Sequence, residues 1–246
     1  MDAHGLLEGK KVLITAAAGT GIGSATARRC QAEGATVVIS DAHERRLGET
    51  ASALGVPSIV CDVTSQEQVD AMFTFAEDEV GPLDVLVNNA GLGGTANVVD
   101  MTDEQWAKVL DVTLTGTFRC VRAALQRMQP RGSGVIVNNS SVLAWRAQAG
   151  QAHYAAAKAG VMALTRCSAM EAAKFGVRVN AVSPSLAMHE NLAKVTSDDV
   201  LKHLTRQEAF GRAAEPDEIA GVIVFLASEY SSYMTGEIVS VSSQHA

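Results

Sequence analysis

The sequence predicts an α/β fold built on a doubly wound parallel sheet of about seven strands, with helices on both faces. Three observations predict it: short β-branched segments alternate with longer amphipathic ones, most of the short segments are nearly all apolar, and a glycine-rich turn follows the first of them. Nearly continuous apolar strands are typical of parallel sheets that are covered on both faces. Repeated strand–helix alternation then indicates a doubly wound arrangement.

The individual elements follow from these patterns. In chain order the seven expected strands are Val12–Thr15, Val37–Ser40, Ser58–Cys61, Val85–Asn88, Val135–Asn139, Val177–Val182 and Glu237–Val241. The expected helices have apolar residues at three- and four-residue spacing, and they include Ser24–Glu33, Gln66–Val80, Asp103–Met128, Tyr154–Phe175 and Pro216–Ser228.

One segment, residues 185–212, stands outside this alternation. It is more polar than the rest of the chain and follows an expected strand. Sheets of this kind bind ligands beyond the carboxyl ends of their strands, so we expect the segment to be a substrate-binding lid. No repeat, low-complexity linker or shift in composition divides the chain, and residues 1–246 are therefore expected to form one domain.

Composition narrows the class of protein. The 246 residues carry 20 Lys+Arg against 27 Asp+Glu, a net charge of −7, which lacks the basic footprint of a nucleic-acid binder. The longest apolar run, Val222–Ala227, is too short to span a membrane, and the N-terminus has no secretory signal. The four cysteines are widely separated, so we expect buried free thiols, no metal site and a cytoplasmic protein.

A glycine-rich turn suggests a dinucleotide site. Its residues lie between the first expected strand and helix, and they are Gly19, Thr20, Gly21, Ile22 and Gly23. Glycines let the backbone approach a pyrophosphate, whose charge is stabilised at a helix N-terminus. The spacing departs from G-x-G-x-x-G because residue 24 is serine, so a tight turn without a ligand is the alternative interpretation.

Carboxylates after the next two strands extend this site. Asp41 lies eighteen residues past Gly23, where it can bind an adenosine ribose and repel a 2′-phosphate, which favours NAD over NADP. Arg45 and Arg46 either serve such a phosphate or form a solvated helix face. Asp62 either binds an adenine amine or caps the following helix.

Three further residues have the character of a catalytic group. Tyr154 and Lys158 are four residues apart and share one face of an expected helix, while Ser141 lies thirteen residues before Tyr154. The three are expected to meet at the strand ends, although an ordinary amphipathic face explains the pair equally simply. An ammonium about 4 Å from the tyrosine would lower its pKa by roughly 3 units at an effective dielectric near 20.

Taken together, these motifs resemble those of the short-chain dehydrogenase/reductase family, over essentially the whole chain, and most closely its 3-oxoacyl-thioester reductases and steroid-type dehydrogenases. The family has a Rossmann-type fold. The motifs are the Gly19–Gly23 turn, Asp62-Val63, Asn88–Gly91, Ser141, Tyr154 with Lys158, Arg178–Pro184, Phe225–Ser228 and Met234–Gly236.

The resemblance implies a role for each matching residue. Tyr154 is the general acid/base, Lys158 binds the nicotinamide ribose and lowers the pKa of Tyr154, and Ser141 orients the substrate oxygen. Further residues are expected to contact the cofactor, on its adenine and on the ribose next to the nicotinamide: Asp62, Val63, Asn89, Ala90, Gly91 and Pro184.

The chain departs from the family pattern at several positions. Either Ala17 replaces the first glycine of the turn, or the turn has one extra residue and Gly19 compensates. Thr113 stands where the family has a fourth catalytic residue, an asparagine that helps to hold a water in a proton path. We expect Thr113 to preserve that path through its hydroxyl or its main-chain carbonyl. His189 stands where a threonine touches the carboxamide.

The expected function is that of an NAD(H)-dependent oxidoreductase, which interconverts a secondary alcohol and a ketone. A 3-hydroxyacyl thioester of CoA or a carrier protein is the first expected substrate, and a fused-ring, steroid-like alcohol is the second. The alternatives are a non-catalytic dinucleotide-binding scaffold or sensor and an NADPH-dependent 3-oxoacyl reductase. The resemblance also implies a homotetramer or homodimer that packs through helices 103–128 and 154–175.

Overall fold

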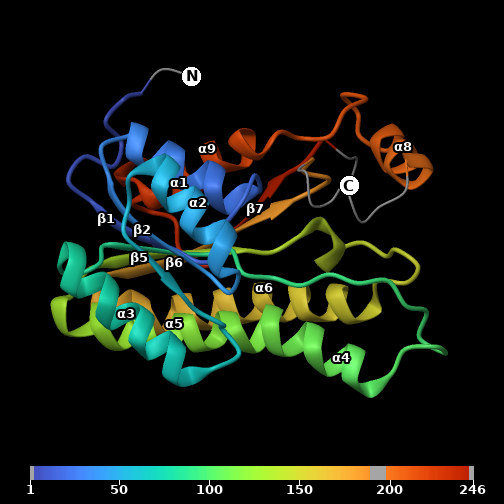
Figure 1. Cartoon of the computed structure of the whole chain (residues 1–246), viewed down its shortest axis with the longest axis horizontal. Coiled ribbons are helices and arrows are strands. Elements are labelled where there is room, and N and C mark those ends of the chain that lie inside the picture. The colour runs from blue at the N-terminus through green and yellow to red at the C-terminus, as the bar shows by residue number, and fades with distance from the viewer. Residues whose placement is uncertain (1–2, 189–197, 244–246) are drawn as a thin grey trace.

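The structure, a computed structural model, describes residues 3–188 and 198–243, and it confirms the expected α/β fold (Figure 1). One sheet of seven parallel strands has the order β3-β2-β1-β4-β5-β6-β7. All seven expected strands are present, with bounds β1 Lys11–Ile14, β2 Thr36–Asp41, β3 Ser58–Val60, β4 Val85–Asn88, β5 Gly134–Asn139, β6 Val177–Pro184 and β7 Ile238–Val241. The strand order reverses between β1 and β4, which is where such sheets bind ligands.

Helices cover the sheet on both sides. In Figure 1, α1 (Ile22–Ala32), α2 (Glu44–Leu54) and α9 (Pro216–Ala227) lie on one face. On the other lie α3 (Gln66–Val80), α5 (Gly116–Met128) and α6 (Ala152–Ala172). The two remaining helices, α4 (Asp103–Leu110) and α8 (Asp198–Arg206), lie at the end of the molecule where the strands end.

The strands are apolar throughout because successive side chains enter different cores. Val12 and Ile14 of β1 pack with α1 and α9 in one buried cluster, whereas Leu13 packs with α3 and α5 in the other. Residues 12–14 are fully buried as a result. The apolar runs seen in the sequence therefore reflect a sheet with no solvent-facing side.

Two helical regions differ from the expectation. The expected helix 103–128 is interrupted by a π-helical turn, η1 (Asp111–Thr115), which separates α4 from α5. The helix α2 is absent from the helix ranges expected above; its sequence is polar, and only Leu47 and Ala51 are buried. Of the four cysteines, Cys30, Cys61 and Cys120 are buried free thiols, but Cys167 is exposed because it lies on an outward position of α6.

The turn between β1 and α1 has an extra residue. Ala16 has a left-handed backbone, with φ of 50°, a conformation that glycine adopts without strain. Ala16, and not Ala17, therefore occupies the position of the first glycine, and Gly19, with φ of 83°, lies in the lengthened part of the turn. Gly23 allows close packing of α1, since a Cβ there would lie 2.4 Å from the carbonyl oxygen of Ala16.

The expected lid is described only in part, because residues 189–197 lie outside the described ranges. A buried carboxylate joins its two ends. Glu208 accepts hydrogen bonds from the Ser185 hydroxyl at 3.1 Å, the Leu186 N–H at 3.3 Å and the Ser243 hydroxyl at 2.8 Å. Within the described part of the chain, no helix has the length and apolar character needed to cross a membrane.

The left-handed alanine leads to a stability prediction. Ala16→Gly should raise the free energy of unfolding by about 1 kcal/mol, because an L-residue in this conformation is strained and glycine is not. Ala17→Gly is the matched control, since Ala17 is buried and has no positive φ. It should instead destabilise the protein by about 1 kcal/mol. Urea denaturation of the two variants measures both changes, and a loss of stability in Ala16→Gly would contradict the strain.

Candidate active site

The ends of β4 and β5 and the first turns of α6 bring together the three residues expected to be catalytic. Ser141 begins the short helix η3 (Val142–Ala144), and its hydroxyl accepts a hydrogen bond from the Leu143 N–H at 3.2 Å. The Ser141 side chain also hydrogen-bonds the hydroxyl of Tyr154. The Nζ of Lys158 lies over the ring of Tyr154, 5.6 Å from its centroid. The sequence pattern thus correctly predicted that these three residues lie close together in the structure.

Lys158 is held firmly beneath this group. Its side chain is buried, and its Nζ donates a hydrogen bond to the carbonyl oxygen of Asn139 at 2.5 Å. A Cβ at Gly91 would lie 3.3 Å from the same Nζ, so the loop after β4 packs directly against the ammonium. A hydrogen bond from the Ser140 hydroxyl to the Lys158 carbonyl at 3.0 Å ties α6 to the end of β5.

Burial dominates the electrostatics of the site. Desolvation raises the pKa of Tyr154, and its hydrogen bond to Ser141 only partly opposes this rise. Desolvation also lowers the pKa of Lys158 to about 8. The expected lowering of the Tyr154 pKa by Lys158 is therefore not found in the chain by itself, because burial raises the tyrosine pKa and only Ser141 opposes that rise.

Thr15 and Asn139, to which the sequence alone assigned no role, link the ends of β1, β4 and β5. Thr15 accepts hydrogen bonds at its hydroxyl from the Asn89 and Ala90 N–H groups, at 3.0 and 3.2 Å. Asn139 donates from its amide to Asn89 Oδ1 at 2.9 Å, and Asn89 donates to the Ala16 carbonyl at 2.8 Å. The sequence did contain a signal for Thr15 and Asn139, since each is a polar residue at the end of an apolar strand.

Thr113 lies in the π-helical turn η1 and is fully buried. Its hydroxyl accepts a hydrogen bond from the Leu92 N–H at 3.0 Å and lies 3.3 Å from the Leu92 carbonyl oxygen. Its own carbonyl accepts from the Thr117 hydroxyl at 2.7 Å. The side chain is thus committed to the loop after β4, so a water of the proton path would be held by the main-chain carbonyl, which also accepts from the Thr117 hydroxyl.

The β1–α1 turn has room for an anionic group. A Cβ added at Gly19 or Gly21 would meet nothing within 4 Å, so the backbone faces open space there. No side chain caps the N-terminus of α1, which begins at Ile22, and its first N–H groups are therefore available to a phosphate. Thr20, between the two glycines, is exposed. These features fit the pyrophosphate of a dinucleotide.

The carboxylate of Asp41 lies beside this turn. Its Oδ2 accepts a hydrogen bond from the Ala18 N–H at 3.1 Å, and its Oδ1 accepts from the His43 N–H at 2.9 Å. The side chain is only partly buried. A ligand on the turn would therefore meet a fixed negative charge at the end of β2.

The other expected cofactor residues lie at the same edge of the sheet. Asp62 accepts at Oδ1 from the N–H and the hydroxyl of Thr64, at 2.9 and 2.8 Å, while Ser65 is the N-cap of α3. Asp62 therefore shapes the turn before the helix without capping it. Val63 is buried, and Pro184 is the last residue of β6. His189 lies outside the described residues.

Comparisons with known proteins agree with this geometry. A family model described as enoyl-(acyl carrier protein) reductase matches residues 16–243. The chain is 67% identical over 250 residues to the (5R,7aS)-5-hydroxy-7a-methyl-1-oxo-2,3,5,6,7,7a-hexahydro-1H-indene-carboxyl-CoA reductase of Mycobacterium tuberculosis, covering 98% of this chain and 95% of that protein. It is 39% identical over 243 residues to the 3-oxoacyl-(acyl-carrier-protein) reductase FabG of Thermotoga maritima, covering 96% and 97%.

A solved structure extends the likeness to three dimensions. The crystal structure of a short chain dehydrogenase from Mycobacterium smegmatis superimposes with a TM-score of 0.89 at 62% sequence identity, covering 100% of this chain and 97% of that one.

The contact between Thr113 and Leu92 leads to a prediction. Thr113→Val keeps the shape of the side chain but removes the acceptor, so the half-buried Leu92 N–H loses its partner at a cost of about 1–2 kcal/mol. Amide hydrogen exchange at Leu92 should become at least about tenfold faster. Thr113→Ser, which keeps the hydroxyl, is the control and should leave that exchange rate nearly unchanged. Equal exchange rates in the two variants would show that the hydroxyl does not hold the loop.

Proposed function

Because the chain belongs to the short-chain dehydrogenase/reductase family, we propose that it is an NAD(H)-dependent enzyme that interconverts a secondary alcohol and a ketone on a fused-ring CoA thioester. The observation that carries the proposal is the meeting of Ser141, Tyr154 and Lys158 at the strand ends, in a chain 67% identical to a carboxyl-CoA reductase. The similar proteins are named reductases and dehydrogenases, so a non-catalytic scaffold is set aside.

In this proposal Tyr154 exchanges a proton with the substrate oxygen. When an alcohol is oxidised, the tyrosine oxygen takes the hydroxyl proton, and it returns a proton when a ketone is reduced. Ser141 already hydrogen-bonds the Tyr154 hydroxyl, so its own hydroxyl lies where it can donate to the same substrate oxygen. A bound nicotinamide dinucleotide supplies the hydride acceptor or donor.

Lys158 supports the proton step from a fixed position. Its hydrogen bond to the Asn139 carbonyl holds the Nζ beside the tyrosine ring, where a positive charge favours the tyrosinate that forms in the proton step. We propose that the same group binds the ribose hydroxyls next to the nicotinamide, with Gly91 and Ala90 on the neighbouring loop. The main-chain carbonyl of Thr113, in place of its side chain, then holds the water of the proton path.

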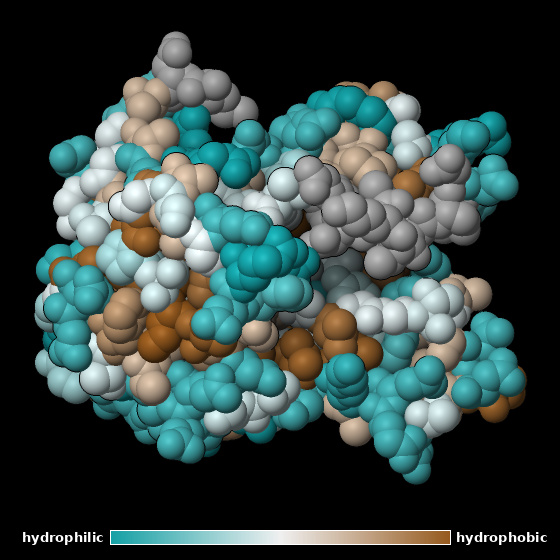
Figure 2. All heavy atoms as spheres, in the orientation of Figure 1, coloured by the Kyte–Doolittle hydropathy of each residue, from teal (hydrophilic) through white to brown (hydrophobic). Residues whose placement is uncertain are grey.

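An apolar side chain beside the site suits a fused-ring substrate. Trp145 directly follows η3, four residues after Ser141, and is 49% exposed. Large exposed apolar side chains beside a catalytic group favour an apolar ligand. In Figure 2 the surface is hollowed between the part of the molecule that carries α8 and the part formed by the segments after β4 and β5. Helix α8, which belongs to the proposed lid, borders this hollow.

The test of the catalytic proposal is Tyr154→Phe. The change removes the ionisable oxygen but keeps the ring over which Lys158 lies, so kcat should fall by about 10²–10⁴-fold while NAD binding is retained. Wild-type alcohol oxidation should rise between pH 7 and pH 9, because the base must be deprotonated, and the residual rate of the variant should lose that rise. Tyr233→Phe, at a fully exposed position, is the control. Turnover of Tyr154→Phe within threefold of wild type would rule out the role.

The cofactor proposal is tested at Asp41. Wild type should prefer NAD(H), because a 2′-phosphate on the β1–α1 turn would meet the carboxylate. Asp41→Ala should weaken NAD binding by about 1–3 kcal/mol and reduce the discrimination against NADP. Asp70→Ala, on the exposed side of α3, is the control. Equal use of NAD and NADP by the wild type would favour the alternative, an NADPH-dependent reductase.

A further inference from the structure

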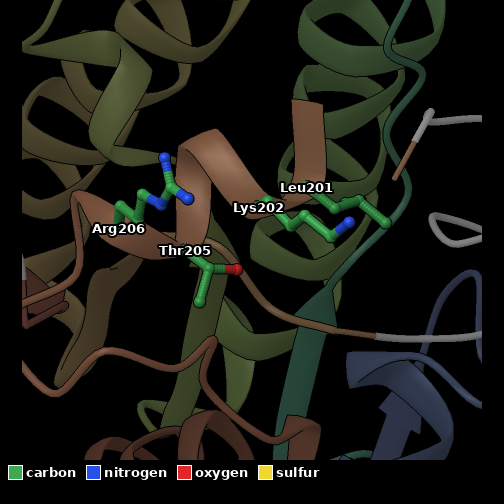
Figure 3. A pocket seen from close by; sticks show the side chains of 4 residues that line it. All are labelled: Leu201, Lys202, Thr205 and Arg206. Atoms are coloured by element: carbon green, nitrogen blue, oxygen red, sulfur yellow. The ribbon is translucent and has the colours of Figure 1, made fainter. Parts of the chain in front are cut away.

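One face of α8, which is part of the proposed lid, lines an open surface pocket of about 370 Å³. Its described lining residues are Leu201, Lys202, Thr205 and Arg206, which lie one to five positions apart and so share one side of the helix (Figure 3). The side chains of Leu201 and Lys202 extend in the same direction, and Arg206 lies one turn further along. The face thus combines two cations with an apolar and a hydroxyl side chain.

The two cations are available to a ligand. Lys202 and Arg206 are exposed, and neither forms an ion pair with any residue that the structure describes. By contrast, Arg28, Arg45 and Arg212 each form an ion pair with a carboxylate. In a chain with a net charge of −7, a pair of free cations beside a cavity favours an anionic ligand there.

The position of α8 suits the remote part of a long substrate. The helix lies at the end of the molecule where the strands end, on the same side as the segments after β4 and β5 (Figure 1). Lys202 and Arg206 are therefore at the edge of the site, away from the buried Lys158. In a CoA thioester the phosphates are joined to the reacting acyl group by the long pantetheine arm, so cations that bind them must lie at such an edge.

We propose that Lys202 and Arg206 bind the phosphate groups of the CoA moiety, with Leu201 and Thr205 against the pantetheine arm. This inference rests on the proposed function, since it names the part of α8 that recognises the thioester. The guanidinium of Arg206 can contact two phosphate oxygens at once, while the ammonium of Lys202 acts as a point charge. The residues that recognise the CoA moiety thus lie apart from Tyr154, where the proton is transferred.

The experiment compares two thioesters of one acid, a hydroxylated bicyclic carboxyl-CoA and its N-acetylcysteamine analogue, which lacks all the phosphates. The double variant Lys202→Gln/Arg206→Gln should raise KM for the CoA thioester by about tenfold, with kcat unchanged. Its KM for the analogue should stay within about twofold of wild type. Arg28→Gln/Lys174→Gln, which removes the same charge far from the site, should leave both KM values unchanged.

Each result has one meaning. An unchanged KM for the CoA thioester, or an equal rise for both thioesters, would overturn the inference and leave the proposed function standing. If wild type oxidises the analogue but not the CoA thioester, or accepts only a carrier-protein thioester, the inference is overturned together with the proposed substrate. If it oxidises neither while NAD still binds, the proposed function itself fails. Added salt should raise the wild-type KM for the CoA thioester alone.

Discussion

The hydrogen bonds of the Asn89 side chain connect the two halves of the site. Its amide donates to the Ala16 carbonyl in the dinucleotide turn, and its Oδ1 accepts from Asn139, whose own carbonyl holds Lys158. The ends of β1, β4 and β5 are therefore linked by one continuous polar network. Such a network is costly if any member loses its partner, so it keeps the turn and the lysine at a constant separation. The strain at Ala16 is tolerated because Asn89 and Thr15 hold the backbone on both sides.

Burial sets the chemistry that this framework allows. With no ligand, desolvation favours neutral tyrosine and lowers the lysine pKa to about 8, so no tyrosinate–ammonium pair is stored in the free protein. The reactive form arises only when further interactions favour the charged states. The geometry that those interactions require already exists, because Ser141, Tyr154 and Lys158 are held by main-chain contacts of β5, η3 and α6. The positions of these three side chains are therefore fixed before a ligand binds, whereas the charged forms of the tyrosine and lysine are not.

The rigid floor of the site and its outer edge serve different purposes. Residues 12–14 and Thr113 are buried, and the Asn89 network and the Thr113 contact with Leu92 are half-buried and hydrogen-bonded, whereas α8 presents exposed side chains. Substitutions in the floor disturb the position of the reacting groups. Under the proposal above, changes on α8 alter which thioester is bound, and substrate preference then varies while the proton chemistry is retained.

Much of the fold and the core of the site could be predicted from the order of residues. The seven strands were predicted because a two-sided sheet requires continuous apolar runs, and the spacing of Tyr154 and Lys158 predicted a shared helix face because helical geometry is local. Local patterns could not predict the π-helical turn at Thr113, the left-handed Ala16, the Asn89–Asn139 bond or the pKa directions. These features depend on contacts between residues up to 75 positions apart, and on how much water the packed chain excludes, which no local sequence pattern contains.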